Sequence, residues 1–268
     1  MHERDTQRFG LLRRARRVWA VGAIHGDAAK LIRLHNALRD RFRLGDRLVY
    51  LGNYLGYGDR IRDTLDELLG FRSTLLGWGS MFPCDVVYLR GSQEEMWNKL
   101  LQIHLAPNAD EVLSWMVKQG AGATLLAYGT EPDLLRARCR EGTLSLARWT
   151  ADTRQAIRAF PGHDELMSVL KRAAYTDDGT MLFVHAGVDT ARPLSAQSDT
   201  FWWGGSDFQG IAEPYGGFRR IVRGFDPEHG GVSIGEIAAT IDGGCGFGGT
   251  LAAACFDHEG QLVDAVDV

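Results

Sequence analysis

The sequence lacks the features that mark secreted, membrane-spanning and nucleic-acid-binding proteins. Its 268 residues include only four cysteines, and their spacing matches no zinc site (Cys84, Cys139, Cys245 and Cys255). No apolar run is long enough to cross a membrane, and the start of the chain has no apolar stretch like that of a signal peptide. The net charge of −4 disfavours nucleic acid and anionic membranes as partners. These absences favour a cytoplasmic protein with neither kind of partner.

An arginine-rich stretch at the N-terminus is the exception to this acidic balance. Residues 1–17 contain several arginines but only Glu3 and Asp5 as acidic groups. We expect this stretch to be a basic, solvated and partly disordered arm, with a docking segment as the alternative. Residues 18–268 are expected to form one domain, because 45% of the chain is hydrophobic and α/β folds of this length often form a single unit.

Patterns of strand, loop and helix alternate three times in the first hundred residues. Strand-forming runs begin at Val18 and recur at residues 47–51 and 85–89, each followed by a polar or Gly-rich loop and a run with helical spacing. This alternation predicts parallel strands joined by crossover helices, with ligand-binding loops at the strands' carboxyl ends. Residues from about 108 to 174 are expected to form a helical insertion, and short strand patterns from residue 181 onward predict a second sheet.

Short motifs in these loops and further along the chain occur in a fixed order. They include Gly22-Ala-Ile-His-Gly26, Gly52-Asn-Tyr-Leu-Gly-Tyr-Gly58, Gly91-Ser-Gln-Glu94, Trp115-Met-Val-Lys-Gln-Gly-Ala121, Val184-His-Ala-Gly-Val188, Asp199-Thr-Phe-Trp-Trp-Gly204 and Ile221-Val-Arg-Gly-Phe-Asp-Pro227. From about residue 18 to residue 257 the sequence resembles the bacterial branch of the phosphoprotein phosphatases, within the calcineurin-like metallophosphatase superfamily. The resemblance implies an α/β fold, a four-layer α/β/β/α metallophosphatase sandwich of two mixed sheets with a helical insertion.

The chemistry of that family needs a particular set of side chains. Two divalent metals about 3.5–4 Å apart polarise a phosphate and generate a hydroxide nucleophile. An Asp bridges the metals, and further Asp, Asn and His side chains complete their coordination. A His protonates the leaving group, and Arg side chains hold the phosphate oxygens.

Most of these groups are missing when the roles are transferred to this sequence by motif position. The resemblance places Ala23 at the first-loop Asp, Asn53 at the bridging Asp, Ser92 at the Asn ligand and Phe225 at a His ligand. It also places Gln93 at the general-acid His, Gly56 at the Asp that orients this His, and Tyr57 and Gly204 at the two phosphate-holding arginines. What remains is a relic site of His25, Asn53, Glu94 and His185, from which we expect no catalytic residues and no bound metal.

The leading interpretation is therefore a pseudophosphatase that acts by binding or regulation. We expect its partners to be other proteins and expect no cofactor. The alternative is an altered phosphoesterase in which His25, Asn53 and His185 hold one Mn, Zn or Fe ion. Asp27, Asp226 and His229 are further candidates for such a remodelled site. A third possibility is a structural homo-oligomer.

Each candidate residue also has a simpler structural interpretation. His25 and His185 are expected to hydrogen-bond to neighbouring backbone, and Asp27 and Asp59 to cap helices. The candidate protein-binding surfaces are the helical insertion, the aromatic residues 201–203 and the Gly-rich segment 204–217 with Tyr215, although residues 202 and 203 are equally compatible with a core position.

Overall fold

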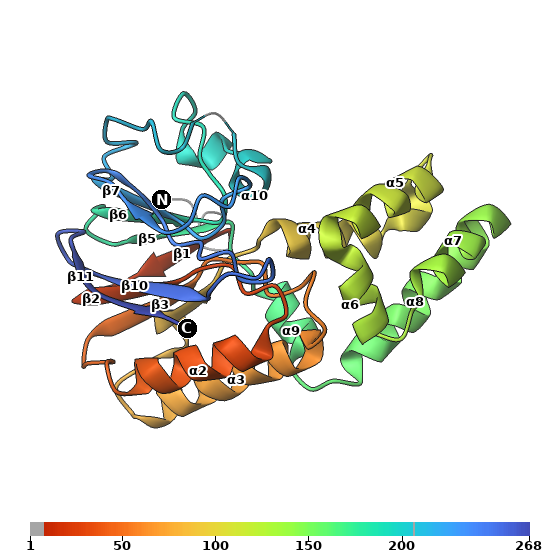
Figure 1. Cartoon of the computed structure of the whole chain (residues 1–268), viewed down its shortest axis with the longest axis horizontal. Coiled ribbons are helices and arrows are strands. Elements are labelled where there is room, and N and C mark those ends of the chain that lie inside the picture. The colour runs from red at the N-terminus through yellow and green to blue at the C-terminus, as the bar shows by residue number, and fades with distance from the viewer. Residues whose placement is uncertain (1–7, 206) are drawn as a thin grey trace.

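The computed structural model describes residues 8–205 and 207–268, in which two mixed β-sheets pack face to face (Figure 1). The first sheet has the strand order β1-β5-β6-β7-β9-β8. Its strands are β1 (Phe9–Leu12), β5 (Ala173–Thr176), β6 (Met181–Val184), β7 (Arg220–Arg223), β8 (Ser233–Ile234) and β9 (Ala238–Thr240). Strands β6, β7 and β9 run parallel to one another, whereas β5 is antiparallel to β6 and β8 to β9.

The second sheet contains the three strands predicted from the first hundred residues. Its order is β11-β10-β2-β3-β4, formed by β2 (Arg17–Val21), β3 (Asp46–Tyr50), β4 (Val86–Tyr88), β10 (Ala252–Asp257) and β11 (Leu262–Asp267). Strands β2, β3 and β4 are parallel, as expected for crossover connections, and β10 and β11 extend the sheet in antiparallel fashion. Two sheets are therefore present as predicted, but β10 and β11, which the sequence assigned to a separate sheet with the other late strands, lie in the same sheet as β2, β3 and β4.

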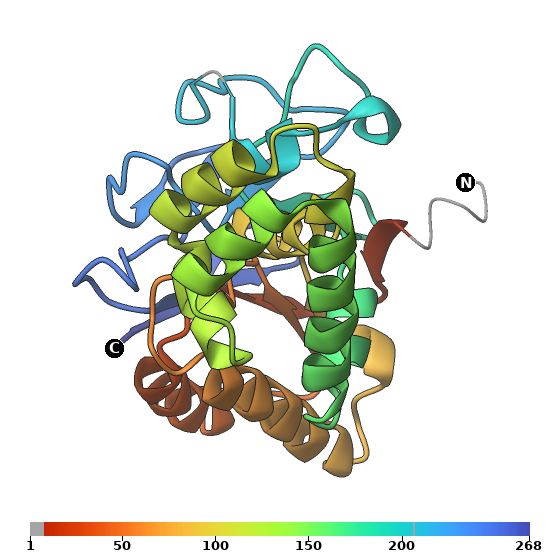
Figure 2. The same ribbon diagram turned by 90° about the vertical axis from the view of Figure 1, so that its right-hand side faces the viewer.

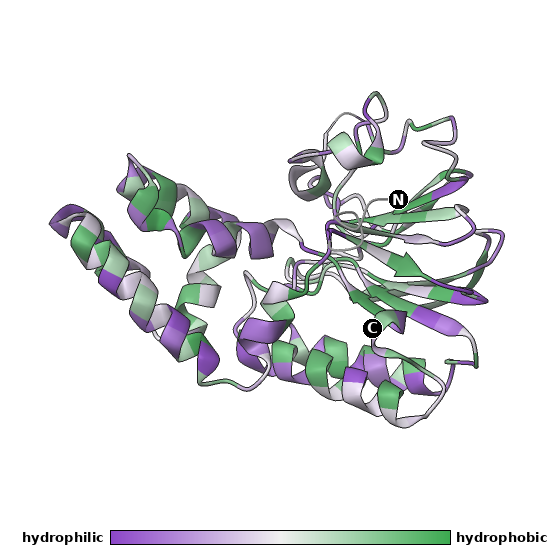
Figure 3. Ribbon diagram, turned by 180° about the vertical axis from the view of Figure 1, so that it is seen from behind, coloured by the Kyte–Doolittle hydropathy of each residue, from purple (hydrophilic) through white to green (hydrophobic). Residues whose placement is uncertain are grey.

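Two long helices cover the outer face of the second sheet, α2 (Ala28–Arg39) and α3 (Ile61–Gly77) (Figure 1). Helix α2 begins where Asp27 accepts a hydrogen bond from the Lys30 N–H at 3.0 Å, so the predicted cap at Asp27 is confirmed. Helix α3 has Arg60 at its N-cap without a side-chain capping bond, so the predicted cap at Asp59 is wrong. Hydrophilic and hydrophobic residues alternate along both ribbons in Figure 3, as expected for helices packed on a sheet.

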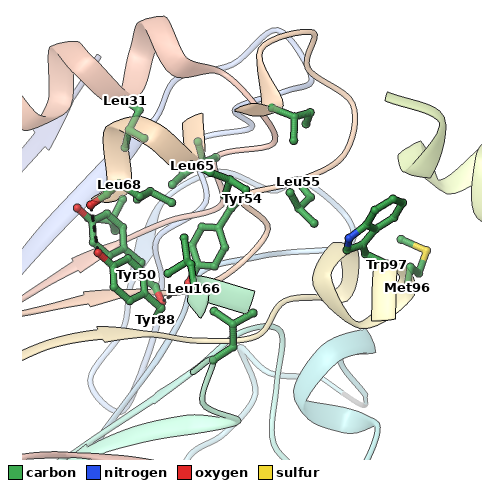
Figure 4. Close-up of a cluster of buried hydrophobic side chains, with 14 of the residues drawn as sticks. Leu31, Tyr50, Tyr54, Leu55, Leu65, Leu68, Tyr88, Met96, Trp97 and Leu166 are labelled. Carbon is green, nitrogen blue, oxygen red and sulfur yellow. Dashed lines mark hydrogen bonds between the residues drawn. The ribbon is translucent and has the colours of Figure 1, made fainter. Parts of the chain in front are cut away.

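The core is divided by the second sheet into two layers. Between the sheets, side chains such as Val49 and Phe183 are fully buried, and the opposite face packs against α2 and α3. Three tyrosines close the core between the second sheet and helices α2 and α3, near the carboxyl ends of the strands (Figure 4). The rings of Tyr50 and Tyr88 stack with centroids 5.0 Å apart, and the Tyr54 hydroxyl donates to the Leu89 carbonyl at 2.7 Å. These contacts anchor the loop that follows β3.

The segment expected to be a helical insertion is mostly helical. Helix α4 (Ser92–Leu100) and the short turn Ile103–Leu105 lead into it. Its helices are α5 (Ala109–Met116), α6 (Gly122–Ala127), α7 (Pro132–Glu141), α8 (Thr143–Arg158) and α9 (His163–Ser168), and a kink at Val117–Ala121 separates α5 from α6. Figures 1 and 2 show α5 to α8 projecting beyond the strand ends as a separate group. Residues 173–174, assigned to the insertion from sequence, lie in β5.

A small aromatic core covers the outer face of the first sheet. Helix α10 (Thr200–Trp203) lies on this face. Two further short helical turns, Pro83–Asp85 and Leu194–Ala196, lie elsewhere in the structure. Phe201, Trp202 and Tyr215 are buried against β5, β6 and β7, so their interpretation as an exposed binding surface is wrong. The layers are thus helix, sheet, sheet and helix, which confirms the predicted α/β sandwich. In the described residues no helix is both long and apolar enough to cross a bilayer.

The N-terminal arm differs from its prediction. Residues 1–7 lie outside the described residues, but Phe9–Leu12 form strand β1, which pairs in parallel with β5. Phe9 and Leu12 are buried in the two cores of the first sheet. The arginines on either side of this short apolar run obscured its strand character. The interpretation of the whole of residues 1–17 as a solvated arm is therefore wrong for residues 9–12.

Candidate functional site

Five loops at the ends of parallel strands meet where the resemblance places the relic site. His25 follows β2, Asn53 follows β3 and Glu94 follows β4, whereas His185 and Phe225 follow β6 and β7 of the other sheet. The structure brings these five residues into one connected group of hydrogen bonds and ring contacts. The strand order explains this, because β2-β3-β4 and β6-β7 present their carboxyl ends at the same edge of the sandwich.

Asn53, at the position of the bridging carboxylate, uses its side chain within the protein. Its carbonyl oxygen accepts hydrogen bonds from the Ser92 hydroxyl at 3.1 Å and the Gln93 N–H at 3.0 Å. Its amide nitrogen lies 3.4 Å from His25 Nε2. The oxygen that would have to hold a cation is therefore already occupied by two donors.

Glu94 holds two loops together through its carboxylate. One oxygen accepts from the N–H groups of Asn53 (2.9 Å) and Gly91 (2.8 Å), and the other from those of Tyr54 (2.8 Å) and Leu55 (3.1 Å). Burial raises the pKa of this carboxyl group, while the four N–H donors oppose the rise. Glu94 points its charge at backbone rather than into the site, so its role here is to fix the loop conformations.

His25 lies among aromatic rings in a left-handed backbone conformation with φ of +52°. Its ring makes edge contacts with Tyr57, Phe225 and Phe247, whose centroids are 5.3, 5.8 and 5.1 Å away. The side chain is buried, and Nδ1 has no hydrogen-bond partner. Burial, reinforced by the nearby His185 and His229, lowers the pKa of His25 to about 3, so the imidazole is neutral near pH 7.

His185 is fixed by one hydrogen bond and one stacked ring. Its Nδ1–H donates to the Leu51 carbonyl at 2.7 Å, which is the backbone bond predicted for a relic histidine. Phe225 stacks on the imidazole with a centroid distance of 5.3 Å and an interplanar angle of 3°. Burial lowers the pKa of His185 to about 4, and Nε2 has no partner. The ring thus keeps a bare nitrogen lone pair turned away from its backbone bond.

An aromatic cover, formed by Tyr57, Phe225, Phe247 and His229, closes the site. The rings of Tyr57 and Phe247 are 4.5 Å apart, and those of Phe247 and His229 are 4.1 Å apart. The covered histidines are buried, whereas Tyr57 and Phe247 each keep close to two fifths of their surface exposed. Phe247 is not predictable from the sequence, because the segment 243–249 shows only its glycines as a pattern. One of these glycines, Gly246, allows this segment to approach His25, since a Cβ at residue 246 would lie 2.5 Å from the Cβ of His25.

The substituted positions fit one another sterically. Gly56 has φ of +79°, and a Cβ on it would lie 2.2 Å from Gln93 Oε1. Gln93 in turn donates from Nε2 to the Gln119 carbonyl at 2.7 Å. Tyr57 packs over Gly120, where a Cβ would lie 2.7 Å from the ring. The residues at the positions that the resemblance assigns to the general acid, its orienting Asp and one Arg therefore form an interlocked packing arrangement.

The remaining predicted positions contribute no ligand atom. Ala23 is buried, and its N–H donates to the Gly224 carbonyl at 2.9 Å. Gly204 has φ of +73° and lies near Pro227. The other candidate ligands are engaged elsewhere: Asp27 pairs with Lys30 (2.7 Å), Asp226 with Arg223 (3.0 Å) and His229 with Asp242 (3.7 Å).

This donor set does not fit a pair of divalent metals. Such ions need charged or strongly donating ligands to offset their dehydration, and the site offers only two unpartnered imidazole nitrogens, on His25 and His185. Across residues 8–205 and 207–268, no three His, Cys, Asp or Glu side chains are grouped as a metal site would require.

Comparison with known proteins places the fold among phosphatases. No protein-family model and no curated protein matches the sequence. Among solved structures, a protein assigned as a diadenosine tetraphosphatase superposes with a TM-score of 0.56 at 18% identity, covering 97% of both chains. A cold-active protein tyrosine phosphatase gives a TM-score of 0.55 at 12% identity, covering 95% of this chain and 80% of the other. A cold-active protein-tyrosine phosphatase of a psychrophilic Shewanella gives 0.53 at 11% identity, with coverage of 96% and 82%. At these identities the similarity defines the fold and not the activity.

Proposed function

We propose that this protein is a pseudophosphatase, a phosphatase-like fold whose function is to bind another protein rather than to hydrolyse phosphate esters. The observation that supports this most directly is the contrast between what has been kept and what has been lost. Glu94, which holds the loops together, is present with all four of its N–H partners. The positions that should face metal or phosphate carry Ala23, Asn53 and Phe225, and aromatic rings fill the space beside them.

The expected loss of metal affinity is large. Removing even a residue that only orients a metal ligand typically weakens binding 10–100-fold, and direct ligands matter at least as much. Four ligand positions are altered, at residues 23, 53, 92 and 225. If their effects are roughly additive, affinity falls by about 10⁴-fold or more. The general acid and both phosphate-holding arginines are missing independently of the metals, so recovery of metal alone would not restore the chemistry.

The proposal is tested by measuring metal content and hydrolysis on the same preparation. The full chain is expressed and purified with excess Mn²⁺ and Zn²⁺ and without chelator, and its metal is determined by elemental analysis. We expect well below one metal per chain and no turnover of small phosphoesters or phosphopeptides above a heat-denatured control. One or two metals per chain together with turnover would refute the proposal.

A second candidate is supported by the two unpartnered ring nitrogens, His25 Nδ1 and His185 Nε2. In this candidate a single ion binds between the histidines after the aromatic cover moves aside, and the protein is an altered phosphoesterase. It predicts at least one metal per chain and complete loss of that metal in His185→Ala. The matched control is His104→Ala, which removes a histidine from the turn that leads into the insertion and should leave the metal content unchanged.

A further inference from the structure

Helices α7 and α8 form a grooved hairpin at the outer end of the insertion. Helix α7 ends at Glu141 and α8 begins at Thr143, so the chain reverses direction over Gly142, which has φ of +101°. The two helices pack against each other as an antiparallel pair. A groove of about 510 Å³ runs along the pair, within the range of about 300–1,000 Å³ that is typical of binding sites. Figures 1 and 2 show both helices on the outer side of the insertion, away from the sheets, where a second molecule can approach.

One face of each helix lines this α7–α8 groove. Helix α7 contributes residues 134, 137, 138 and 141, and α8 contributes residues 149, 152, 153 and 156. Both sets have spacings of three, one and three residues, which is the pattern of a helix face that packs on another helix. Other faces of the two helices are already covered, because Leu135 and Leu146 are buried in the hydrophobic core. The groove face is therefore the one that an additional helix can cover.

The middle of the groove is apolar. Leu134 is 63% exposed, whereas Trp149 is only 4% exposed and its Nε1 donates to the Thr130 hydroxyl at 3.0 Å. The indole thus forms a fixed apolar floor beside an uncovered leucine. Ala137 and Ala156 are small, so they allow another helix to approach closely. An apolar side chain of a second molecule can therefore be buried against Trp149.

The charges in the groove are complementary to those of a second copy of the same groove. Arg138 precedes Gly142 by four residues and Asp152 follows it by ten, so at about 1.5 Å per residue they lie about 6 Å and about 15 Å from the turn. The level midway between them is that of Trp149. When a second copy is turned end for end about this level, Arg138 of each copy comes to the height of Asp152 of the other. Glu141, the third charged residue of the groove, then lies level with uncharged residues of the copy.

We propose that the α7–α8 groove is the interface of a homodimer. A twofold axis crosses the two hairpins near Trp149, so that four helices pack with Leu134 of each copy in the groove of the other and Arg138 opposite Asp152. A partner segment with charges of one sign would meet a like charge in this groove, whereas a second copy meets opposite charges at both places. The inference goes beyond the proposed function and uses no residue of the relic site, so the two can fail separately.

The test measures the molecular mass of the full chain by size-exclusion chromatography with light scattering over a range of concentrations. We expect a dimer, with twice the mass of the 29.6 kDa chain. Leu134→Asp should raise the dissociation constant of the dimer about tenfold or more, because it removes apolar contact from both halves of the interface. The matched control is Leu44→Asp, which changes a 70% exposed leucine outside the insertion and should leave the constant unchanged.

An exchange of charges tests the twofold arrangement itself. Arg138→Glu places two acidic groups at each contact, and Asp152→Arg places two arginines there, so each variant alone should dimerise about tenfold more weakly. Mixed in equal amounts, the two variants should form a heterodimer as strong as the original dimer, because every acidic group then faces an arginine of the other chain. A loss of folding within one chain could not produce this recovery.

The proposal is overturned if the full chain is a monomer at concentrations up to about 100 μM, or if Leu134→Asp dimerises as strongly as Leu44→Asp. It is also overturned if the mixed charge variants associate no more strongly than either variant alone, because the two copies then do not meet through Arg138 and Asp152. None of these results alters the metal content or the phosphatase assay, which test the proposed function by themselves.

Discussion

Replacing Glu94 with Gln is predicted to lower the free energy of unfolding by about 3 kcal/mol. The glutamine keeps one oxygen but places an NH₂ group against two of the four N–H donors that now converge on the carboxylate. Two hydrogen bonds to a charged group are lost, each worth about 1.5–3 kcal/mol. The lower end of the summed range applies, because the substitution also removes a buried negative charge whose pKa is raised by burial.

The assay is urea unfolding at pH 7 followed by tryptophan fluorescence, with the slope of the transition used to check that both variants unfold in the same way. Glu95→Gln is the matched control, because the next residue along α4 pairs with the partly exposed Arg90 (3.2 Å) and Lys99 (3.7 Å). Its loss should be about 1 kcal/mol or less. If Glu94→Gln proves no more destabilising than Glu95→Gln, the argument that Glu94 was kept to hold the loops is wrong.

Three other outcomes follow from the site. The folded pKa of His185 is about 4, below its unfolded value of about 6.5, so this group lowers stability as pH falls from about 6.5 to 4, by roughly 3 kcal/mol in total. His185→Asn, which keeps a donor for the Leu51 carbonyl, should flatten that part of the pH profile in chemical denaturation; an unchanged profile would contradict the assignment of a neutral ring. Gly56→Ala should cost at least about 1 kcal/mol more than Gly129→Ala, because both have positive φ but only Gly56 has a side chain in the way. Equal melting curves for the two would show that Gln93 moves freely. Phe247→Ala should speed modification of His25 by diethylpyrocarbonate, measured by peptide mass spectrometry, whereas Phe82→Ala, remote and exposed, should not.

Local patterns were sufficient to predict the elements that carry the site. The runs that became β2, β3 and β4 are mostly apolar, although β2 begins with Arg17 and β3 with Asp46 and Arg47, and each is followed by a loop and a helix, so period and order alone predict parallel pairing. The helix cap at Asp27 depends on a contact three residues away and was predicted correctly. The cap predicted at Asp59 is wrong. The backbone there depends on the hydrogen bond from the Gly58 N–H to the His25 carbonyl, which joins residues that are distant in sequence.

Contacts between distant segments decided what the site contains. Phe247 and Tyr57 meet over His25 from loops almost two hundred residues apart, and no periodicity encodes such a meeting. The same holds for β1, whose four apolar residues gain strand structure only by pairing with β5. The bridge between Lys171 and Leu89 is also a property of the folded sheet alone.

The sequence by itself predicted the three strand–loop–helix units of the first hundred residues and the residue types at positions 23, 53, 92 and 225, where the resemblance would place metal ligands, because both depend on local motifs. The tertiary structure decided that the histidines are buried and neutral, that their site is covered by aromatic rings, and that Glu94 binds backbone. Burial, ring packing and hydrogen bonding are properties of neighbours in space. The chain brings those neighbours together only when both sheets have formed.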